Sequence, residues 1–255
     1  MTQPLRAAMS FLSDALLSKR LGRRHFILFR DHPIAYGRIP KVANTSVKTA
    51  LTRLLPNGDD LRKGASPDRL WDVGTGGRTR MIRARDAVKL TDVFVFSFVR
   101  DPFERAASYY ATKVAGAGDL PRLAARDGLR KGMPFAAFLE RLGEMDDRDM
   151  DDHLTPQSVI LRHGERLAPR FIGRQEAMAE HWEELRRRLV AFGAPDLGPL
   201  PHRNRRAPDE GHDLAAYFAD PALIRLMRER YADDFALFYP DADPLRPRRP
   251  CDDAA

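Results

Sequence analysis

The sequence predicts an α/β protein with a P-loop-like, mainly parallel sheet flanked by helices. Two segments indicate this fold class most directly, because residues 34–55 and 92–110 each read as a strand, a tight polar turn and a helix. Strands that alternate with helices favour parallel pairing, with helices on both faces of the sheet. A chain of 255 residues can form one such domain with a sizeable core. We therefore expect a single domain over residues 1–240 and a flexible C-terminal tail over residues 241–255.

The first segment places an anion site at the start of a helix. Residues 34–39 are apolar enough for a strand, and apolar residues then recur with helical spacing at Val47, Ala50, Leu51, Leu54 and Leu55. Asn44, Thr45 and Ser46 are all good N-cap residues, and the N–H groups and dipole of a helix N-terminus favour an anion. Lys41 adds a mobile positive charge. The alternative interpretation is an ordinary capped helix after a strand.

The second segment places an arginine at the end of a neighbouring strand. Residues 92–99 are rich in β-branched and aromatic side chains, as in a buried central strand. Asp101 can cap the helix that follows, Pro102 suits its first position, and Glu104 completes a capping box. Arg100 then lies at the carboxyl end of the strand, where open α/β sheets bind ligands. Together with the first site, this arginine suits a ligand with phosphates at both ends. The alternative for Arg100 is an ion pair with Asp101 or Glu104.

Together the two segments resemble the 3′-phosphoadenosine-5′-phosphosulfate (PAPS)-dependent sulfotransferases, in particular their carbohydrate sulfotransferase branch. In that family a Pro-Lys-x-x-x-Thr/Ser loop binds the 5′-phosphosulfate. A Val-Arg-Asp/Glu-Pro-x-x-Arg-x-x-Ser segment binds the 3′-phosphate through its arginine and serine. The matching residues are Pro40, Lys41, Thr45 and Ser46 for the first pattern, and Val99, Arg100, Asp101, Pro102, Phe103, Arg105 and Ser108 for the second. The resemblance implies that PAPS is bound by Lys41, Asn44, Thr45, Ser46, Val47, Arg100 and Ser108.

Three later stretches extend the resemblance over most of residues 34–240. Residues 153–157 resemble the His-x-x-Pro-Gln element of the carbohydrate branch, and residues 171–176 resemble its Phe/Tyr-Ile/Val-Gly-Arg/Lys-x-Glu strand end. Residues 201–204, followed by a tyrosine-containing helix and Asp234, resemble its C-terminal pattern. The chain lacks the His-Gly-His that some uronyl-directed members carry before the second strand and use for the base. It also has no cysteine framework like that of the Golgi enzymes.

The mechanism that the resemblance implies is an in-line transfer of a sulfuryl group from PAPS to a hydroxyl, with adenosine 3′,5′-bisphosphate leaving. Lys41 would stabilise the charge that develops on the bridging oxygen. His153 would act as general base, because histidine changes charge near neutral pH, and Asp151 or Asp152 would orient or replace it. Alternatively, His153 is a loop residue that binds substrate or caps a helix. Four other polar residues are weaker candidates for binding the substrate or the nucleotide: Gln157, Glu176, His202 and Arg203. Arg38 and Lys48 flank the loop, where they would only screen charge.

The composition favours an anionic ligand. The chain has 43 lysine and arginine residues against 36 aspartate and glutamate residues, which gives a net charge of +7. This excess suits the nucleotide and an acidic glycan as partners, although solvated surface charge is the alternative. Nucleic acid is not expected as a partner, because the charge is scattered and no reader motif is present. No cluster of metal-ligating residues is apparent, so no metal is expected.

The sequence indicates a cytoplasmic protein. Its single cysteine, Cys251, cannot form an internal disulfide. The N-terminus has no long apolar run, so neither a signal peptide nor an integral membrane span is expected. Residues 11–17 form at most a short amphipathic turn or two, which packs against the domain or rests on a membrane surface.

The remaining pattern predicts further elements. Strands are expected over residues 25–29, 79–85 and 170–173, and helices over residues 133–142, 177–192 and 221–235. Residues 57–77 read as a loop-rich insertion that contains Trp71. One helix carries a stripe of core residues: Met178, Trp182, Leu185 and Leu189.

Two other function classes stay open. A nucleotide kinase with a degenerate phosphate loop would bind ATP with magnesium, although residues 40–46 lack the glycines of a Walker loop. A non-catalytic nucleotide- or polyanion-binding module would bind without turnover. Within the sulfotransferase interpretation we expect a carbohydrate acceptor, with a small alcohol, a lipid or a protein tyrosine as alternatives.

Overall fold

The computed structural model describes residues 24–65, 67–147, 150–201 and 213–246. Several expectations concern residues outside these ranges: the amphipathic turn at residues 11–17, the candidates His202 and Arg203, Cys251, and the end of the C-terminal tail. The limits proposed for the domain and its tail stay a prediction.

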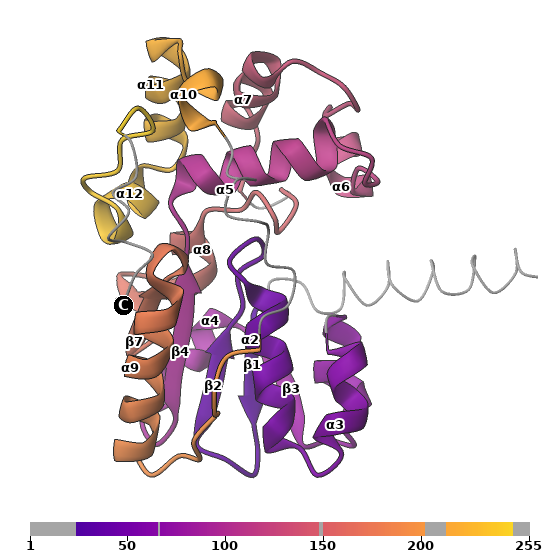
Figure 1. Cartoon of the computed structure of the whole chain (residues 1–255), viewed down its shortest axis with the longest axis vertical. Helices are drawn as coiled ribbons and strands as arrows, with labels where there is room; N and C mark the ends of the chain where they lie inside the picture. The colour runs from indigo at the N-terminus through magenta and orange to yellow at the C-terminus, as the bar shows by residue number, and fades with distance from the viewer. Residues whose placement is uncertain (1–23, 66, 148–149, 202–212, 247–255) are drawn as a thin grey trace, which may run out of the picture.

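A five-stranded sheet with strand order β3-β1-β2-β4-β7 forms the lower half of the described molecule in Figure 1. The strands are β1 (Phe26–Phe29), β2 (Ile34–Gly37), β3 (Thr79–Ile82), β4 (Phe94–Val99) and β7 (Phe171–Arg174). β2, β4 and β7 run parallel, whereas β1 is antiparallel to β2 and to β3. The short connection from β1 to β2 has no room for a crossover, so it pairs them as a hairpin. The α/β prediction is confirmed, and the parallel part of the sheet contains both strands that lead into the predicted anion sites.

Helices cover the sheet and extend beyond one of its ends. They are α2 (Asn44–Leu51), α3 (Gly58–Leu61), α4 (Ala84–Ala87), α5 (Pro102–Tyr109), α6 (Arg122–Arg126), α7 (Phe135–Gly143), α8 (Gln157–Leu161), α9 (Met178–Ala191), α10 (Leu214–Tyr217), α11 (Pro221–Arg230) and α12 (Ala232–Phe238). Shorter elements are the 3₁₀ turns Thr52–Leu54, Arg62–Gly64 and Gln175–Ala177, the π-helical turns η3 (Leu70–Gly74) and η4 (Tyr110–Val114), and the hairpin β5 (Arg162–His163)–β6 (Arg166–Leu167).

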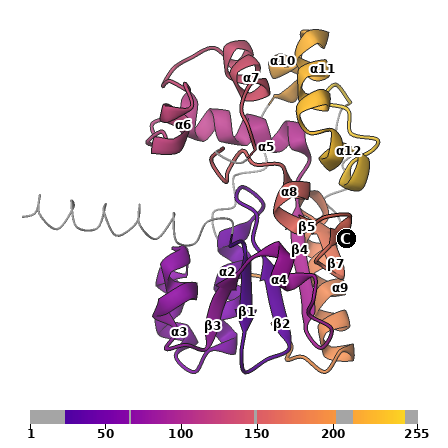
Figure 2. The same ribbon diagram turned by 180° about the vertical axis from the view of Figure 1, so that it is seen from behind.

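The arrangement of these helices leaves the carboxyl ends of β2 and β4 facing a second, helical half of the molecule. Figure 1 shows α2 and α9 on one face of the sheet, and Figure 2 shows α4 on the other. In both views α5 crosses above the sheet, and α6, α7, α10, α11 and α12 lie around or beyond it. The two predicted anion sites therefore lie between the two halves.

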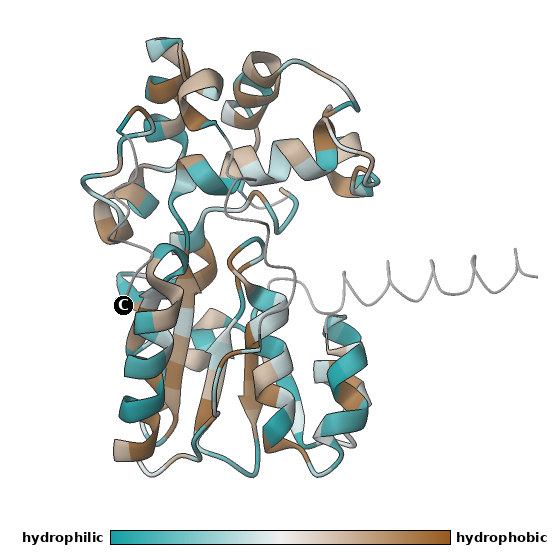
Figure 3. Ribbon diagram, in the orientation of Figure 1, coloured by the Kyte–Doolittle hydropathy of each residue, from teal (hydrophilic) through white to brown (hydrophobic). Residues whose placement is uncertain are grey.

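Aromatic side chains join the strands to one another and to α9. Phe96 stacks on Tyr36 of β2 with ring centroids 5.2 Å apart, and Phe98 stacks on Trp182 of α9 at 6.1 Å. The predicted stripe of α9 is confirmed, with three buried members and one at the core margin: Trp182, Leu185 and Leu189, and Met178. Figure 3 shows the apolar strands inside and the polar outer surfaces of α3 and α9. Large buried aromatic rings therefore fix β4 against its neighbours.

Side chains of the preceding segment cover the edge strand β3. The Thr79 N–H donates to Thr75 Oγ1 at 3.1 Å, and the Met81 N–H donates to Asp72 Oδ1 at 3.4 Å. Trp71 is buried beside them. The segment over residues 57–77 is thus partly helical rather than a plain loop, since it contains α3 and η3. Because side chains occupy these N–H groups, they are not available to another strand.

Two predicted helices have different limits in the structure. The helix expected over residues 133–142 begins at Phe135, because the preceding Pro134 is extended, with φ −59° and ψ 151°. The helix expected over residues 221–235 is interrupted at Tyr231, whose φ of −116° and ψ of 34° are not helical. The final helix is therefore two helices, α11 and α12.

Candidate active site

The loop between β2 and α2 turns through two left-handed residues. Lys41 has φ 70° and Ala43 has φ 55°. Helix α2 starts at Asn44 with Ala43 as its N-cap, and no side chain caps it within the described residues. The prediction that Asn44, Thr45 or Ser46 caps this helix is wrong, because Ala43 already makes the turn; the three residues form the first helical turn instead. The dipole of α2 favours an anion at this end.

The second motif segment holds this loop in its unusual conformation. A positive φ costs a non-glycine residue on the order of 1–2 kcal/mol, so surrounding contacts must maintain it. Arg100 Nη1 donates to the Lys41 carbonyl at 3.3 Å, and Arg105 Nε donates to the Pro40 carbonyl at 3.3 Å. Val47, predicted to bind PAPS, is a buried core residue whose N–H donates to the Ala43 carbonyl at 3.2 Å. The Val47 N–H is therefore already used within the helix.

Arg38 and Lys48 belong to a buried ionic cluster beside the loop. Arg38 Nη2 lies 2.9 Å from one oxygen of Asp68, and Lys48 Nζ lies 3.1 Å from the other. Arg38 Nη2 and His25 Nε2 each lie 3.7 Å from the Asp152 carboxylate. Burial raises the pKa of Asp68, but the charges of Arg38 and Lys48 outweigh this and hold it below its usual range. Because Asp68 balances both cations, they bind within the fold rather than simply screening a phosphate.

The start of α5 forms as predicted, except for the capping box. Asp101 Oδ1 accepts the Phe103 N–H at 2.8 Å, which caps the helix. Glu104 does not complete the box, because its Oε2 accepts from Arg100 Nη2 at 3.0 Å, while the Asp101 N–H donates to Glu176 Oε1 at 2.9 Å. The ion pair that was the alternative for Arg100 is thus present. A guanidinium carries further N–H donors, so the pair does not exhaust its capacity to bind an anion.

Four polar side chains follow one another at intervals of four from the end of β4 to η4: Arg100, Glu104, Ser108 and Thr112 (hereafter the α5 ridge). Glu104 and Ser108 share a face of α5. Arg100 lies before the helix and is joined to them by its ion pair with Glu104. Thr112 Oγ1 accepts from Lys41 Nζ at 2.9 Å and donates to the Ser108 carbonyl at 2.7 Å. Lys41 therefore touches the ridge at both ends, through its carbonyl at Arg100 and its ammonium at Thr112. The structure brings the predicted Lys41, Arg100 and Ser108 into one neighbourhood.

Arg105 lies beside this ridge, fully buried, and joins separate stretches of backbone. Besides Pro40, its guanidinium donates to the Thr155 carbonyl at 2.9 Å and to the Asp152 carbonyl at 3.2 Å. Arg105 is one of the residues that matched the second motif, yet its donors meet backbone carbonyls of this chain. It therefore fixes the segment that contains His153 next to the loop between β2 and α2.

His153 is oriented by the carboxylate two residues before it. Its Nδ1 lies 2.7 Å from Asp151 Oδ1, which also accepts the His153 backbone N–H at 2.8 Å. The ring packs against Tyr109 of α5, with centroids 6.2 Å apart, and the side chain is 39% exposed. Burial raises the pKa of Asp151, but its bonds from His153 and the charge of His153 outweigh this and hold it below the usual range. A proton on Nδ1 satisfies Asp151 and leaves Nε2 as an acceptor.

Two of the weaker candidates for binding substrate or nucleotide, Gln157 and Glu176, form hydrogen bonds with the protein backbone. Gln157 pairs with the N–H and carbonyl of Arg100, and Glu176 accepts the Asp101 N–H. Sequence reasoning missed this because glutamine and glutamate suit substrate binding equally well, and their partners are far away in the chain. The only signal was their place in motif-like stretches.

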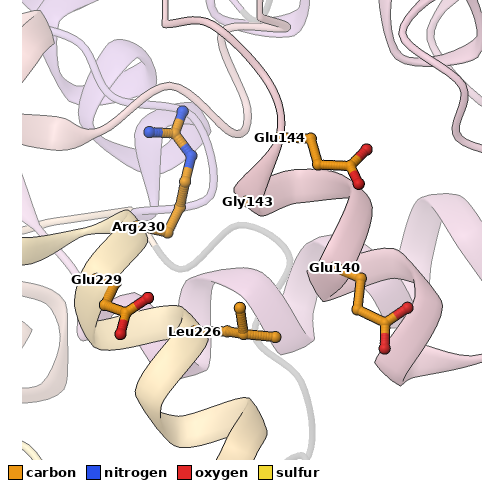
Figure 4. Close-up of a pocket in the computed structure, with 6 residues that line it drawn as sticks. All are labelled: Glu140, Gly143, Glu144, Leu226, Glu229 and Arg230. Atoms are coloured by element: carbon orange, nitrogen blue, oxygen red, sulfur yellow. The ribbon is translucent and has the colours of Figure 1, made fainter.

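Two cavities of the described residues lie elsewhere. One of about 470 Å³ opens between α7 and α11 and is lined by Glu140, Gly143, Glu144, Leu226, Glu229 and Arg230 (Figure 4). Its three glutamates would repel phosphate groups. A second, of about 340 Å³, is lined by Arg53 and residues 55–60 beyond the far end of α2. Neither adjoins the α5 ridge.

The described part of the chain also bears on metals and membranes. It contains no group of three or more His, Cys, Asp and Glu side chains that could hold a metal ion. None of its helices combines the length and apolar character needed to cross a membrane.

Comparison with known proteins adds one finding. A family model described as Sulfotransferase family matches residues 24–240, which is most of the chain. The match runs from β1 to α12 and includes the α5 ridge, the loop between β2 and α2, and His153. No curated protein and no solved structure matches the chain.

Proposed function

This chain belongs to the sulfotransferase family, and we propose that it transfers the sulfuryl group of PAPS to a hydroxyl group of a carbohydrate. Sulfuryl transfer to a hydroxyl acceptor follows from the family, while the donor and the carbohydrate are the proposal. The observation that carries it is the contact of Lys41 with both ends of the α5 ridge. This contact joins the two predicted anion sites, as a donor with two phosphate-bearing ends requires. The carbohydrate acceptor rests on the resemblance of residues 153–157 and 171–176 to elements of the carbohydrate branch.

The residues of the site fit such a donor. The first turn of α2, with Asn44, Thr45 and Ser46, favours the 5′-phosphosulfate. Arg100 and Ser108 would hold the 3′-phosphate, Arg100 through the N–H donors that Glu104 and the Lys41 carbonyl leave. When bound, PAPS supplies an activated sulfuryl group on a bisphosphate leaving group.

Lys41 and His153 would supply the catalytic groups. The ammonium of Lys41, held by Thr112, stabilises the negative charge that grows on the leaving oxygen as the sulfur–oxygen bond breaks. His153 Nε2 takes the proton of the acceptor hydroxyl, whose oxygen forms the new bond to sulfur. Asp151 holds Nδ1–H and stabilises the charged ring that results.

The test is transfer of labelled sulfate from PAPS to a panel of glycans, lipids, tyrosine peptides and small alcohols. We expect transfer to a glycan, and we expect His153→Ala to lower turnover by about 10²-fold or more. Its affinity for adenosine 3′,5′-bisphosphate should stay near the wild-type value, because a base contacts the acceptor and not the leaving nucleotide. His163→Ala, which removes an exposed histidine from β5, is the matched control and should keep full activity.

The other outcomes favour other assignments. Full activity of His153→Ala would contradict its role as base and direct attention to Asp151 and Asp152. Transfer to a lipid, peptide or alcohol but to no glycan would contradict the carbohydrate acceptor. Bisphosphate binding without transfer to any acceptor would favour the non-catalytic module.

A further inference from the structure

The backbone of Arg100 lies beyond the sheet, and a distant side chain completes its hydrogen bonds. β4 ends at Val99, and its last pairing with β2 is Ser97 opposite Gly37. Gln157 Oε1 accepts the Arg100 N–H at 2.9 Å, and Gln157 Nε2 donates to the Arg100 carbonyl at 2.7 Å. One primary amide thus pairs with both backbone groups of the residue that follows the strand.

A second side chain fixes the next residue. Glu176 Oε1 accepts the Asp101 N–H at 2.9 Å, and its other oxygen accepts the Tyr239 hydroxyl at 2.7 Å. Gln157 is completely buried, so removal of its amide would take these partners from the Arg100 backbone in the interior, which is costly. Two segments far from α5 in the chain therefore meet where Arg100 leaves the sheet.

Gln157 also lies four residues after His153, in a segment that is anchored at both ends. Arg105 fixes the first part through the Asp152 and Thr155 carbonyls. Gln157 fixes the last part to Arg100. The segment therefore links His153, the proposed base, to Arg100, the proposed phosphate-binding arginine.

We propose that Gln157 is a positioning residue for Arg100, which places the guanidinium where it can distinguish a nucleotide with a 3′-phosphate from one without. The proposal rests on the proposed function, because it takes Arg100 as the contact to that phosphate. Charge-assisted hydrogen bonds depend on distance and angle, so a displaced Arg100 backbone weakens this contact more than those at the N-terminus of α2. Glu176 contributes to the same positioning through Asp101.

The test is the affinity of four proteins for adenosine 3′,5′-bisphosphate and for AMP, measured by calorimetry: the wild type, Gln157→Met, Arg100→Ala and the double variant. Methionine keeps the length of the side chain and removes its amide. Gln157→Met should lower the preference for the bisphosphate over AMP by about five- to twentyfold. When Arg100 is already replaced by alanine, Gln157→Met should not change that preference further. A double-mutant cycle isolates the part of the Gln157 effect that depends on the arginine.

A matched control separates positioning from stability. Arg53→Met removes side-chain hydrogen bonds to the Leu197 and Pro199 carbonyls, away from the α5 ridge. It should lower the melting temperature and keep the preference for the bisphosphate.

Several outcomes would overturn the positioning role. Gln157→Met could weaken both nucleotides equally, or lower the preference just as much in the Arg100→Ala background; either result would make Gln157 a structural residue only. A wild type without any preference for the bisphosphate would contradict the proposed donor as well, which distinguishes the two failures. If Gln157→Met does not fold, Glu176→Met tests the neighbouring bond: a fall in preference that Arg100→Ala abolishes supports the proposal, and an unchanged preference contradicts it.

Discussion

Lys41 is the residue on which most of the proposed chemistry depends, and its position depends on its backbone. At φ 70° its carbonyl meets Arg100, while its ammonium meets Thr112 at the other end of the α5 ridge. Because one residue makes both contacts, a change that moves the loop also moves the charged group. The strained turn is therefore part of how the ammonium is placed.

Replacement of this lysine should separate chemistry from binding. We expect Lys41→Ala to lower turnover of sulfate transfer by about 10²–10³-fold, because it removes a charge whose stabilising effect grows in the transition state. Turnover and bisphosphate affinity are measured side by side, with Lys89→Ala, an exposed lysine after α4, as the control. If Lys41→Ala and Lys89→Ala turned over at similar rates, Lys41 would not be the catalytic cation.

At the scale of an element, the start of α5 combines a helix cap with crowded carboxylates. Asp101 accepts the Phe103 N–H and so caps the helix. Burial raises its pKa to about 6, with the Glu176 and Glu104 carboxylates adding to the rise and the bond from Phe103 opposing it. The charged form of the Asp101 carboxylate therefore lowers the stability of the folded protein.

This cost predicts a pH dependence of stability. Because the pKa is higher in the folded protein than its ordinary value of 3.8, the folded state binds the proton more tightly. Stability from this group therefore falls as pH rises from about 4 to about 6. Asparagine caps a helix about as well as aspartate and does not ionise. The free energy of unfolding of Asp101→Asn should therefore rise by about 1–3 kcal/mol relative to that of the wild type over this pH interval.

Denaturant unfolding across the same pH range checks this expectation. Carboxylates whose pKa is lowered, such as Asp151 and Asp68, are present in both proteins and cancel in the difference. Asp220→Asn, at the exposed N-cap of α11, controls for the exchange of a capping residue and should not reproduce the gain. A difference between the wild type and Asp101→Asn that stayed constant with pH would show that the carboxylate carries no such cost.

For the whole molecule, the placement of the site between the sheet and the helical half predicts which nucleotide stabilises the fold. One proposed anion site lies at the start of α2 and the other at the end of β4, so a nucleoside with phosphates at opposite ends should bind best. Adenosine 3′,5′-bisphosphate at 100 times its dissociation constant should add about 2.7 kcal/mol to the free energy of unfolding. At equal concentrations AMP and ADP should add less; ADP is the matched control, because it carries two phosphates on one side.

Thermal unfolding with the three nucleotides measures this directly. Equal stabilisation by AMP would remove the reason for assigning Arg100 to a 3′-phosphate. Stronger stabilisation by ATP with magnesium would favour the nucleotide kinase that the sequence left open.

Local patterns were sufficient to predict the elements that carry the site. Strand β4, the Asp101 cap and the apolar stripe of α9 follow from side-chain periodicity and capping preferences, which act between residues a few positions apart. The same kind of reasoning failed at Ala43, because an alanine side chain does not indicate a left-handed backbone conformation. It also failed at Tyr231, where the predicted final helix breaks in two.

The partners of the polar side chains, by contrast, depend on how distant segments pack. Glu104 was expected to cap its own helix, but it pairs with Arg100, and the vacant position is taken by Glu176, 75 residues from Asp101. Gln157 reaches Arg100 across 57 residues and Arg105 reaches Pro40 across 65. A glutamine or glutamate can satisfy its hydrogen bonds with many groups, and burial decides which are within reach. Residue types therefore indicated the charged groups of the proposed site, while the fold selected which of them bind one another.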